Sequence, residues 1–284
     1  MRFLLLLLLG FFTASLSAAG ITLTFQRASD VDLENPHDVR LTPNGRYLAV
    51  SDVGNNRVVM LDPETLTFKG SFGRDHQAGT HDVEFDAAGL AYVADTHNNR
   101  VTIYRLDGLE AELIGELSER VRGPEGVLAH PNGRIYVAGA WSNNLVVYAN
   151  GDVVAELGGL SSPHDVELDI SGNIWLAEAG NDRLLLLTPE LEVLEELAGP
   201  PYDFNGVRYL DLTSDGILFA ADKNNHQIKI IAPDRSLMHV IGDGKPGLGE
   251  GRFRTPEGVE IRGSTVWLAD SGNDRVVKYS FEIN

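Results

Sequence analysis

The segment YVADTHNNRVTIY, Tyr92–Tyr104, decides the fold of this chain of 284 residues. It contains two short runs of apolar and β-branched residues joined by an asparagine-rich turn, which is typical of a β-hairpin. The pattern returns five times, about 40 residues apart, as AVSDVGNNRVVML, YVAGAWSNNLVVY, WLAEAGNDRLLLL, FAADKNNHQIKII and WLADSGNDRVVKY. A fixed period of this length with several short strands per unit predicts a β-propeller or a similar array.

Each repeat has enough residues for four strands. An apolar run led by Asp-Val or Gly-Val precedes each hairpin, and another run follows it. We therefore expect one all-β domain over residues 20–284, a six-bladed β-propeller with blades starting near residues 35, 79, 123, 162, 203 and 255. The last repeat stops after three strands. The run ITLTFQ (Ile21–Gln26) is predicted to complete this last blade, because an unpaired outer edge is a liability.

The six repeats resemble NHL repeats. The resemblance rests on the hairpins, on the strand starts GPEGV and TPEGV, and on GDGKPGLGEGRFRTPEGV at Gly242–Val259. It covers essentially all of residues 20–284 and implies a six-bladed propeller. Because one fold carries many functions, the resemblance implies no single activity.

Composition and the first residues indicate where the protein works. Residues 1–19 place Arg2, an apolar run and small residues before Gly20, a pattern typical of a secretory signal peptide and too short for a comfortable membrane span. The chain has no cysteine and a net charge of −18 without a basic stripe. We expect a secreted or periplasmic, bacterial monomer with no disulfide, no stable membrane insertion and no nucleic-acid partner.

The hairpins carry their own polar pattern. In five repeats an acidic residue ends the first hairpin strand, and an arginine or glutamine follows five positions later, as in Asp95 and Arg100. We interpret these pairs as structural ties between strands or blades. The third repeat has Gly139 and Asn144 at the two positions, with Trp141 between them, and such breaks in a repeat mark candidate functional positions.

The residue before each Asp-Val or Gly-Val starts an innermost strand, so one such residue per blade lies at the same end of the channel. These residues are His37, His81, Glu125, His164, Asn205 and Glu257. The hairpin turns are expected at the same end, which places His97 and Trp141 beside them. Imidazole and carboxylate are ordinary zinc ligands. Alternate blades supply His81, His164 and Glu257, and two histidines plus a glutamate form a recognised catalytic zinc set.

A second resemblance bears on this set. The repeats are similar to those of peptidyl-α-hydroxyglycine α-amidating lyase, which implies zinc at His81, His164 and Glu257 and calcium deeper in the channel. Trp141 stands where that lyase has its catalytic tyrosine, and an indole N–H cannot act as a base. We therefore expect a different reaction if the chain is an enzyme. In a metal-dependent lyase or hydrolase, Glu125 or His37 is the candidate general base.

Two further interpretations stay open. The face can bind a peptide, a glycan or a protein partner, with Trp141, His97, Asn205 and Tyr202 as candidate ligand-binding residues. Tyr202 and Phe204 are then expected to form an exposed aromatic patch with Trp141. Alternatively, the protein has a purely structural role in the cell envelope, and the polar residues at the mouth bind nothing, because propeller channels are wet and tolerate polar side chains.

Overall fold

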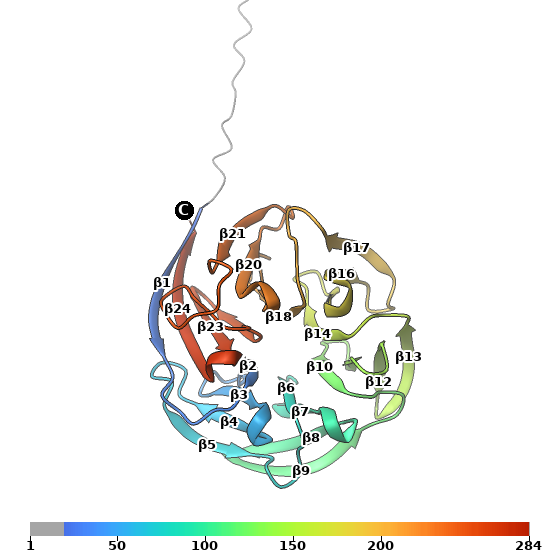
Figure 1. Ribbon diagram of the computed structural model, residues 1–284. Helices are drawn as coiled ribbons and strands as arrows, with labels where there is room; N and C mark the ends of the chain where they lie inside the picture. The colour runs from blue at the N-terminus through green and yellow to red at the C-terminus, as the bar shows by residue number, and fades with distance from the viewer. Residues whose placement is uncertain (1–19, 284) are drawn as a thin grey trace, which may run out of the picture.

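The computed structural model describes residues 20–283 and confirms the six-bladed β-propeller (Figure 1). Six antiparallel sheets of four strands stand around a central channel. The predicted signal peptide, residues 1–19, lies outside the described residues. Within residues 20–283, no helix has both the length and the apolar character that crossing a membrane requires.

The strands of each blade follow one another outward from the axis. Blade one has β2 (Pro36–Leu41), β3 (Leu48–Asp52), β4 (Arg57–Leu61) and β5 (Phe68–Phe72). Blade two has β6 (Thr80–Phe85), β7 (Leu90–Asp95), β8 (Arg100–Asp107) and β9 (Glu110–Leu117). Blade three has β10 (Pro124–Ala129), β11 (Arg134–Gly139), β12 (Asn144–Ala149) and β13 (Asp152–Gly158).

The second half of the ring repeats this order. Blade four has β14 (Pro163–Leu168), β15 (Ile174–Glu178), β16 (Arg183–Leu187) and β17 (Val193–Ala198). Blade five has β18 (Val207–Leu212), β19 (Leu218–Asp222), β20 (Gln227–Ile231) and β21 (Leu237–Ile241). Blade six has β22 (Val259–Arg262), β23 (Thr265–Asp270), β24 (Arg275–Ile283) and β1 (Ile21–Ala28). Short 3-10 turns join the second and third strands of five blades: η1 (Val53–Asn55), η2 (Thr96–Asn98), η3 (Ala179–Asn181), η4 (Lys223–Asn225) and η5 (Ser271–Asn273).

Strand β1 closes the ring as predicted. It pairs antiparallel with β24, from Ile21 opposite Ile283 to Ala28 opposite Val277. Blade six is therefore built from two ends of the described chain (Figure 1). The pairing gives β24 a hydrogen-bonded neighbour on both sides, and β1 becomes the outermost strand, as the fourth strand does in the other five blades.

The hydrophobic core lies between neighbouring blades. Strands β3, β15 and β19 are buried along their whole length. Side chains alternate between the two faces of a strand, so each inner strand packs against the blades on both sides. One cluster, for example, joins Val39 and Val50 of blade one to Trp267 and Ala269 of blade six. This burial of apolar surface is the main source of stability in a chain without disulfides.

The hairpin pairs are structural, as interpreted from the sequence. In blade one, Arg57 Nε lies 2.7 Å from Asp52 Oδ2, and Asp52 Oδ1 accepts a hydrogen bond from Glu34 N at 2.7 Å. The carboxylate thus ties the hairpin to the loop that enters the same blade. In blade five the arginine position holds Gln227, and Lys229 Nζ lies 2.6 Å from Asp222 in place of the arginine contact. In blade three, Ser142 Oγ accepts the loop N–H of Arg122 instead.

Candidate functional site

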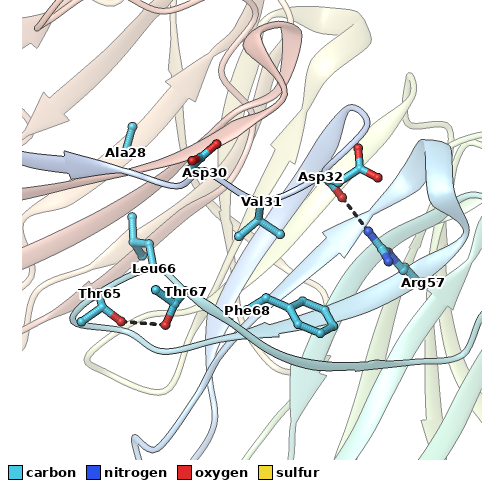
Figure 2. Close-up of a pocket in the computed structure, with 9 residues that line it drawn as sticks. All are labelled: Ala28, Asp30, Val31, Asp32, Arg57, Thr65, Leu66, Thr67 and Phe68. Atoms are coloured by element: carbon cyan, nitrogen blue, oxygen red, sulfur yellow. Dashed lines mark hydrogen bonds between the residues drawn. The ribbon is translucent and has the colours of Figure 1, made fainter.

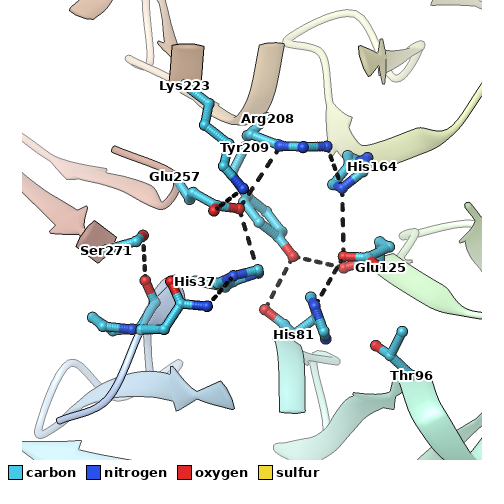
Figure 3. Close-up of polar contacts among 12 residues, drawn as sticks. His37, His81, Thr96, Glu125, His164, Arg208, Tyr209, Lys223, Glu257 and Ser271 are labelled. Atoms are coloured by element: carbon cyan, nitrogen blue, oxygen red, sulfur yellow. Dashed lines mark hydrogen bonds and ion pairs between the residues drawn. The ribbon is translucent and has the colours of Figure 1, made fainter. Parts of the chain in front are cut away.

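The polar ring lies at the channel end where the hairpin turns lie, which we call the mouth (Figure 3). The backbone register identifies its members. In five blades the first residue of the innermost strand pairs with the end of the next strand, as Pro36 pairs with Asp52 and Val207 with Asp222, and the ring residue follows directly. In blade six, Glu257 precedes β22, and its N–H donates to the carbonyl of Ala269 next to the end of β23. The ring is therefore His37, His81, Glu125, His164, Arg208 and Glu257.

Arg208 corrects the sequence-based assignment of Asn205 to the ring. Gly206 and Val207 look like the Gly-Val pair of GPEGV in blade three. They stand three residues before Tyr209 and Leu210, which are the true equivalents of that pair. Asn205 N donates to Asp222 Oδ1 at 2.7 Å, the contact that Glu34 N makes in blade one. Asn205 thus belongs to the loop. Aligning LDL at 210–212 with VEL at 166–168 of SPHDVEL would have found Arg208.

Two ring histidines have the same tautomer. Nδ1 of His81 lies 2.9 Å from the carbonyl of Gly79, and Nδ1 of His164 lies 3.0 Å from the carbonyl of Ser162. A carbonyl only accepts, so both imidazoles carry their proton on Nδ1 and keep a lone pair on Nε2. Nε2 of His164 accepts a hydrogen bond from Arg208 Nη1. Nε2 of His81 lies 3.5 Å from Glu125 Oε2.

His37 is held between two different partners. Asn35 Nδ2 donates to its Nε2 at 3.0 Å, which places the ring proton on Nδ1. This Nδ1 lies 3.3 Å from Glu257 Oε2. The ring of His37 also packs edge to face against His81, with centroids 4.4 Å apart.

Burial controls the charge of these groups. It lowers the pKa of His81 to about 3 and holds the pKa of His37 and of His164 well below the usual value, with Arg208 adding to the effect on both. Burial also raises the pKa of Glu125 to about 8, with the nearby Glu257 carboxylate as second cause. The three imidazoles are therefore neutral at pH 7, and the Glu125 carboxyl is mostly protonated.

The formal charges of the mouth come from blades five and six. Lys223 Nζ lies 2.6 Å from Glu257 Oε1, and Arg208 Nε lies 3.8 Å from Glu257 Oε2. Lys223 is the first residue of the turn η4 and reaches inward over Glu257 (Figure 3). Two cations thus face one carboxylate.

Tyr209 closes the channel below the ring. Its hydroxyl lies 3.0 Å from the carbonyl of His81 and 2.8 Å from the carbonyl of Glu125, and it is buried. It thus reaches from blade five across the axis to blades two and three (Figure 3). Gly126 holds the corresponding position in blade three, where a Cβ would lie 2.4 Å from the carbonyl oxygen of His164. Tyr209 therefore crosses the channel directly below the ring.

The ring concentrates unused hydrogen-bonding capacity. Of the eleven buried side-chain polar atoms without a hydrogen-bond partner in residues 20–283, five belong to the ring. They are His37 Nδ1, Glu125 Oε2, Arg208 Nε, Glu257 Oε1 and Glu257 Oε2. Of these, Glu257 Oε1 has a close ion pair with Lys223 Nζ, and the other four have only contacts of 3.3 Å or longer. Most buried polar groups in proteins are paired, so this concentration separates the ring from the rest of the fold.

An aromatic wall lies beside the ring, as predicted from the hairpin turns. His97 and Trp141 stack with centroids 5.8 Å apart and planes 18° apart, and His97 lies 6.1 Å from His81. The Trp141 side chain is 49% exposed. It packs over Gly123, which has a φ of +54° and whose Cβ would lie 2.4 Å from the indole. The wall therefore depends on a glycine in the entering loop.

Tyr202 does not form an exposed patch, so this part of the expected binding surface is wrong. Tyr202 and Phe204 are both buried and stack on each other with centroids 5.7 Å apart. The Tyr202 hydroxyl donates to the carbonyl of Arg235, and Lys229 lies over the Phe204 ring. Both side chains are core residues of blades four and five.

The structure groups the metal-ligand candidates differently from the sequence. His37, His81 and Glu125 of three adjacent blades bring one ligand atom each within 4.8 Å of one another. In the predicted set, by contrast, His164 is bound by Arg208 and Glu257 by Lys223. Two imidazole nitrogens and a carboxylate oxygen suit a zinc-type ion. Binding there requires Glu125 to lose its proton. The positive charges of Arg208 and Lys223 lower the pKa of Glu125 and so favour that loss, but they also repel a metal cation.

A second ring lies three residues further along the innermost strands, below Tyr209. Arg40 lies 2.9 Å from Glu84, 2.6 Å from Glu167 and 3.5 Å from Glu260. Burial raises the pKa of Glu84 to about 7 and that of Asp211 to about 8. A hollow of about 300 Å³ opens at this end. Because Arg40 joins carboxylates from three other blades, we interpret this lower ring as a structural cross-link.

A further hollow, of about 460 Å³, lies on the outer side of blade one (Figure 2). It forms where the chain passes from β1 to β2, beside Asp30, Asp32 and Phe68. Its one arginine, Arg57, is already bound to Asp52 and to the carbonyl of Asp32. None of its lining residues belongs to either ring. Its position is a consequence of ring closure, and the candidate site remains the mouth.

Comparisons with known proteins agree with the fold. No family model matches the chain. NHL repeat-containing protein 2 of Gallus gallus is 27% identical over 94 residues, which cover 31% of this chain and 13% of that protein. The chain thus matches only 13% of this relative's length.

Two solved structures cover most of the chain. Selenomethionine-substituted virginiamycin B lyase from Staphylococcus aureus has a TM-score of 0.65 at 14% identity, covering 92% of this chain and 99% of the lyase chain. A protein of unknown function from Bacteroides thetaiotaomicron has a TM-score of 0.75 at 11% identity, covering 93% of this chain and 76% of its own. At these identities the solved structures show the fold alone. Together with the NHL repeat match, they support an NHL-type six-bladed propeller.

Proposed function

We propose that the protein is a binding module and that a peptide, a glycan or a protruding segment of a protein partner binds at the mouth. The unpartnered buried atoms of the ring carry this proposal. An unpaired buried polar group costs about 1–3 kcal/mol. Apart from Glu257 Oε1, which has its ion pair with Lys223, the ring keeps four such atoms together, and packing does not explain that cost. Polar groups of a ligand would satisfy them.

The surroundings of the ring support a ligand of limited size. Trp141 is half exposed beside the ring, and exposed aromatic side chains are enriched in binding surfaces. Tyr209 blocks the channel below, so a ligand that enters the mouth ends at its ring. The site is therefore suited to a chain end or a small molecule more than to a long threaded chain.

Calorimetry with defined probes tests this proposal. The probes are short peptides with free or amidated carboxyl ends and short oligosaccharides, each titrated into wild type, Trp141→Ala and Phe68→Ala. We expect one class to bind and the Trp141 variant to lose about tenfold or more in affinity, as for a central aromatic anchor. Phe68 is exposed on blade one, so its variant should bind like wild type. Equal affinity in all three proteins would contradict a site at the mouth.

The second proposed function is a metal-dependent lyase or hydrolase, favoured by the grouping of His37, His81 and Glu125. A bound divalent ion would polarise a substrate oxygen or activate water. With these three residues as ligands, neither His37 nor Glu125 is free to serve as the general base. The base would then be His164, whose Nε2 lone pair is presently held by Arg208.

Metal analysis of untagged protein decides this second proposal. About one zinc-type ion per chain in wild type, lost in a His37→Ala/His81→Ala variant, would support it. His239→Ala is the matched control, because His239 is an exposed histidine of β21. If none of the three proteins holds a metal, the metal-dependent enzyme is ruled out and the binding module remains.

We also propose that the protein is exported to the periplasm or the medium, on the pattern of residues 1–19. Intact-mass measurement after expression with its own N-terminus tests this. A mature chain beginning at Gly20 in the exported fraction is the expected result, and a full-length chain retained in the cytoplasm would contradict it.

A further inference from the structure

Blade five differs from the other blades at the mouth because it places two cations there. Arg208 occupies its ring position, and Lys223 begins its hairpin turn. The other blades have uncharged residues at the position of Lys223, namely Val53, Thr96, Ala140, Ala179 and Ser271. Two adjacent cations in a chain with a net charge of −18 indicate a local preference for an anion.

These two cations keep binding capacity after their internal contacts are counted. Both face the single carboxylate of Glu257, and Arg208 Nε has no hydrogen-bond partner. Their side chains are 16% and 24% exposed, so a group at the mouth can reach them. The other ring carboxyl, Glu125, lies on the far side of His164, 3.6 Å from its Nε2. While Glu125 keeps its proton, one positive charge is left without a counter-charge, which matches a monoanion such as a carboxylate.

The opposite side of the mouth is aromatic. Blades two and five face each other across a ring of six, and Tyr209 of blade five contacts the carbonyl of His81 in blade two. From His81, the rings continue outward through His97 at 6.1 Å to Trp141 at a further 5.8 Å. A ligand with an acidic end and an apolar body therefore matches the chemistry of the two sides.

We infer that the mouth recognises a carboxylate carried on an aromatic or apolar body. Arg208 and Lys223 bind the acidic group, and Trp141 and His97 contact the body. This inference rests on the proposed binding function and names the chemical class of its ligand. The same chemistry is offered by a small organic acid and by the C-terminus of a peptide that ends in an aromatic residue.

Two pairs of probes test the inference on EDTA-dialysed protein by calorimetry. N-acetylphenylalanine is compared with its amide, and a glycine-rich tetrapeptide ending in phenylalanine is compared with its amidated form. We expect each acid to bind about tenfold or more tightly than its amide, because a charge-assisted hydrogen bond is lost in the amide. The tighter-binding acid identifies the source, a free small acid or a peptide end.

Variants locate the contact. Lys223→Gln should weaken acid binding about tenfold and leave amide binding unchanged, and Lys223→Arg should retain acid binding. Arg208→Gln should act similarly. If Arg208→Gln unfolds the protein, the two Lys223 variants still show whether a cation of blade five binds the acid. Arg105→Gln is the control, because Arg105 is an exposed arginine of β8 paired only with Glu112.

The outcomes separate this inference from the proposed function. If acids and amides bind equally, or if no probe binds at millimolar concentration, carboxylate recognition is overturned. Should Trp141→Ala still weaken acids and amides alike, the mouth remains a binding site for another class of ligand. If neither the Trp141 nor the Lys223 variant changes the affinity of a probe that binds, both proposals fail.

Discussion

Replacing Glu125 by glutamine should stabilise the metal-free protein increasingly as the pH rises. Burial raises the pKa of this carboxyl from 4.5 to about 8 in the folded state. Between these values the folded protein keeps a proton that the unfolded chain releases. The free energy of unfolding therefore falls as the pH rises from about 4.5 to about 8 and levels off above it. Glutamine resembles the protonated carboxyl and cannot ionise, so the variant lacks this part of the slope.

The pKa values set the size of the effect. At about 1.4 kcal/mol per pKa unit, the shift from 4.5 to about 8 amounts to at most about 5 kcal/mol. Structural relaxation around a buried charge reduces this value, so we expect a gain of about 2–5 kcal/mol for the variant near pH 8.5. Near pH 5 the difference should approach zero. Glu84 and Asp211 also have raised pKa values, but their effects are common to both proteins and cancel.

Urea unfolding followed by circular dichroism, on EDTA-dialysed protein between about pH 5 and pH 9, measures this difference. Glu112→Gln serves as the matched control, because Glu112 is an exposed glutamate of β9 and its removal should give no comparable pH trend. A difference between Glu125→Gln and wild type that stays constant over this range would refute the reasoning. It would mean that Glu125 is ionised in the folded protein throughout, for example by a cation that dialysis does not remove.

Three other changes test how the channel is built. Tyr209→Phe removes the hydroxyl that contacts two buried carbonyls and should cost about 1–3 kcal/mol in urea unfolding; an unchanged midpoint would contradict a role in closing the channel. Gly126→Ala places a Cβ 2.4 Å from the backbone oxygen of His164 and should lower the melting temperature, whereas Gly158→Ala, with no atom within 4 Å, should not; equal melting temperatures would contradict the close packing of blades three and four. Deleting Ile21–Ala28 exposes β24 and should abolish cooperative unfolding or cause association, measured by calorimetry and light scattering, and a stable monomer would contradict closure by β1.

The fold was predictable because its determinants are local and repeated. The asparagine-rich turn, the alternation of apolar residues and the acidic residue at the end of the hairpin strand each act within a few residues of one another, as Asp95 and Arg100 do. Six repetitions predict the propeller, and the orphan strand predicts its closure. The same reasoning placed His37, His81, Glu125, His164 and Glu257 at one end of the channel, with His97 and Trp141 beside them.

The site itself required the tertiary structure. A shift of three residues in one loop moved Asn205 out of the ring and brought in Arg208, because the loop is held by Asp222 and not by the Gly-Val pair. The burial of Tyr202 depends on contacts with residues of blades four and five that its own segment does not predict. The protonation state of Glu125 depends on residues far away in the sequence, because its raised pKa comes from burial and from Glu257 in another blade.

Sequence by itself therefore determined the number of blades, their strands and the end of the channel at which the polar residues gather, since these follow from turns and from alternation along single strands. Only the tertiary structure decided which side chains meet there, that Tyr209 blocks the channel, and that two cations face an aromatic wall across the mouth. The physical reason is that these contacts join residues of different blades, such as Arg208 with His164 and Lys223 with Glu257. Their geometry depends on how all six blades close around one axis.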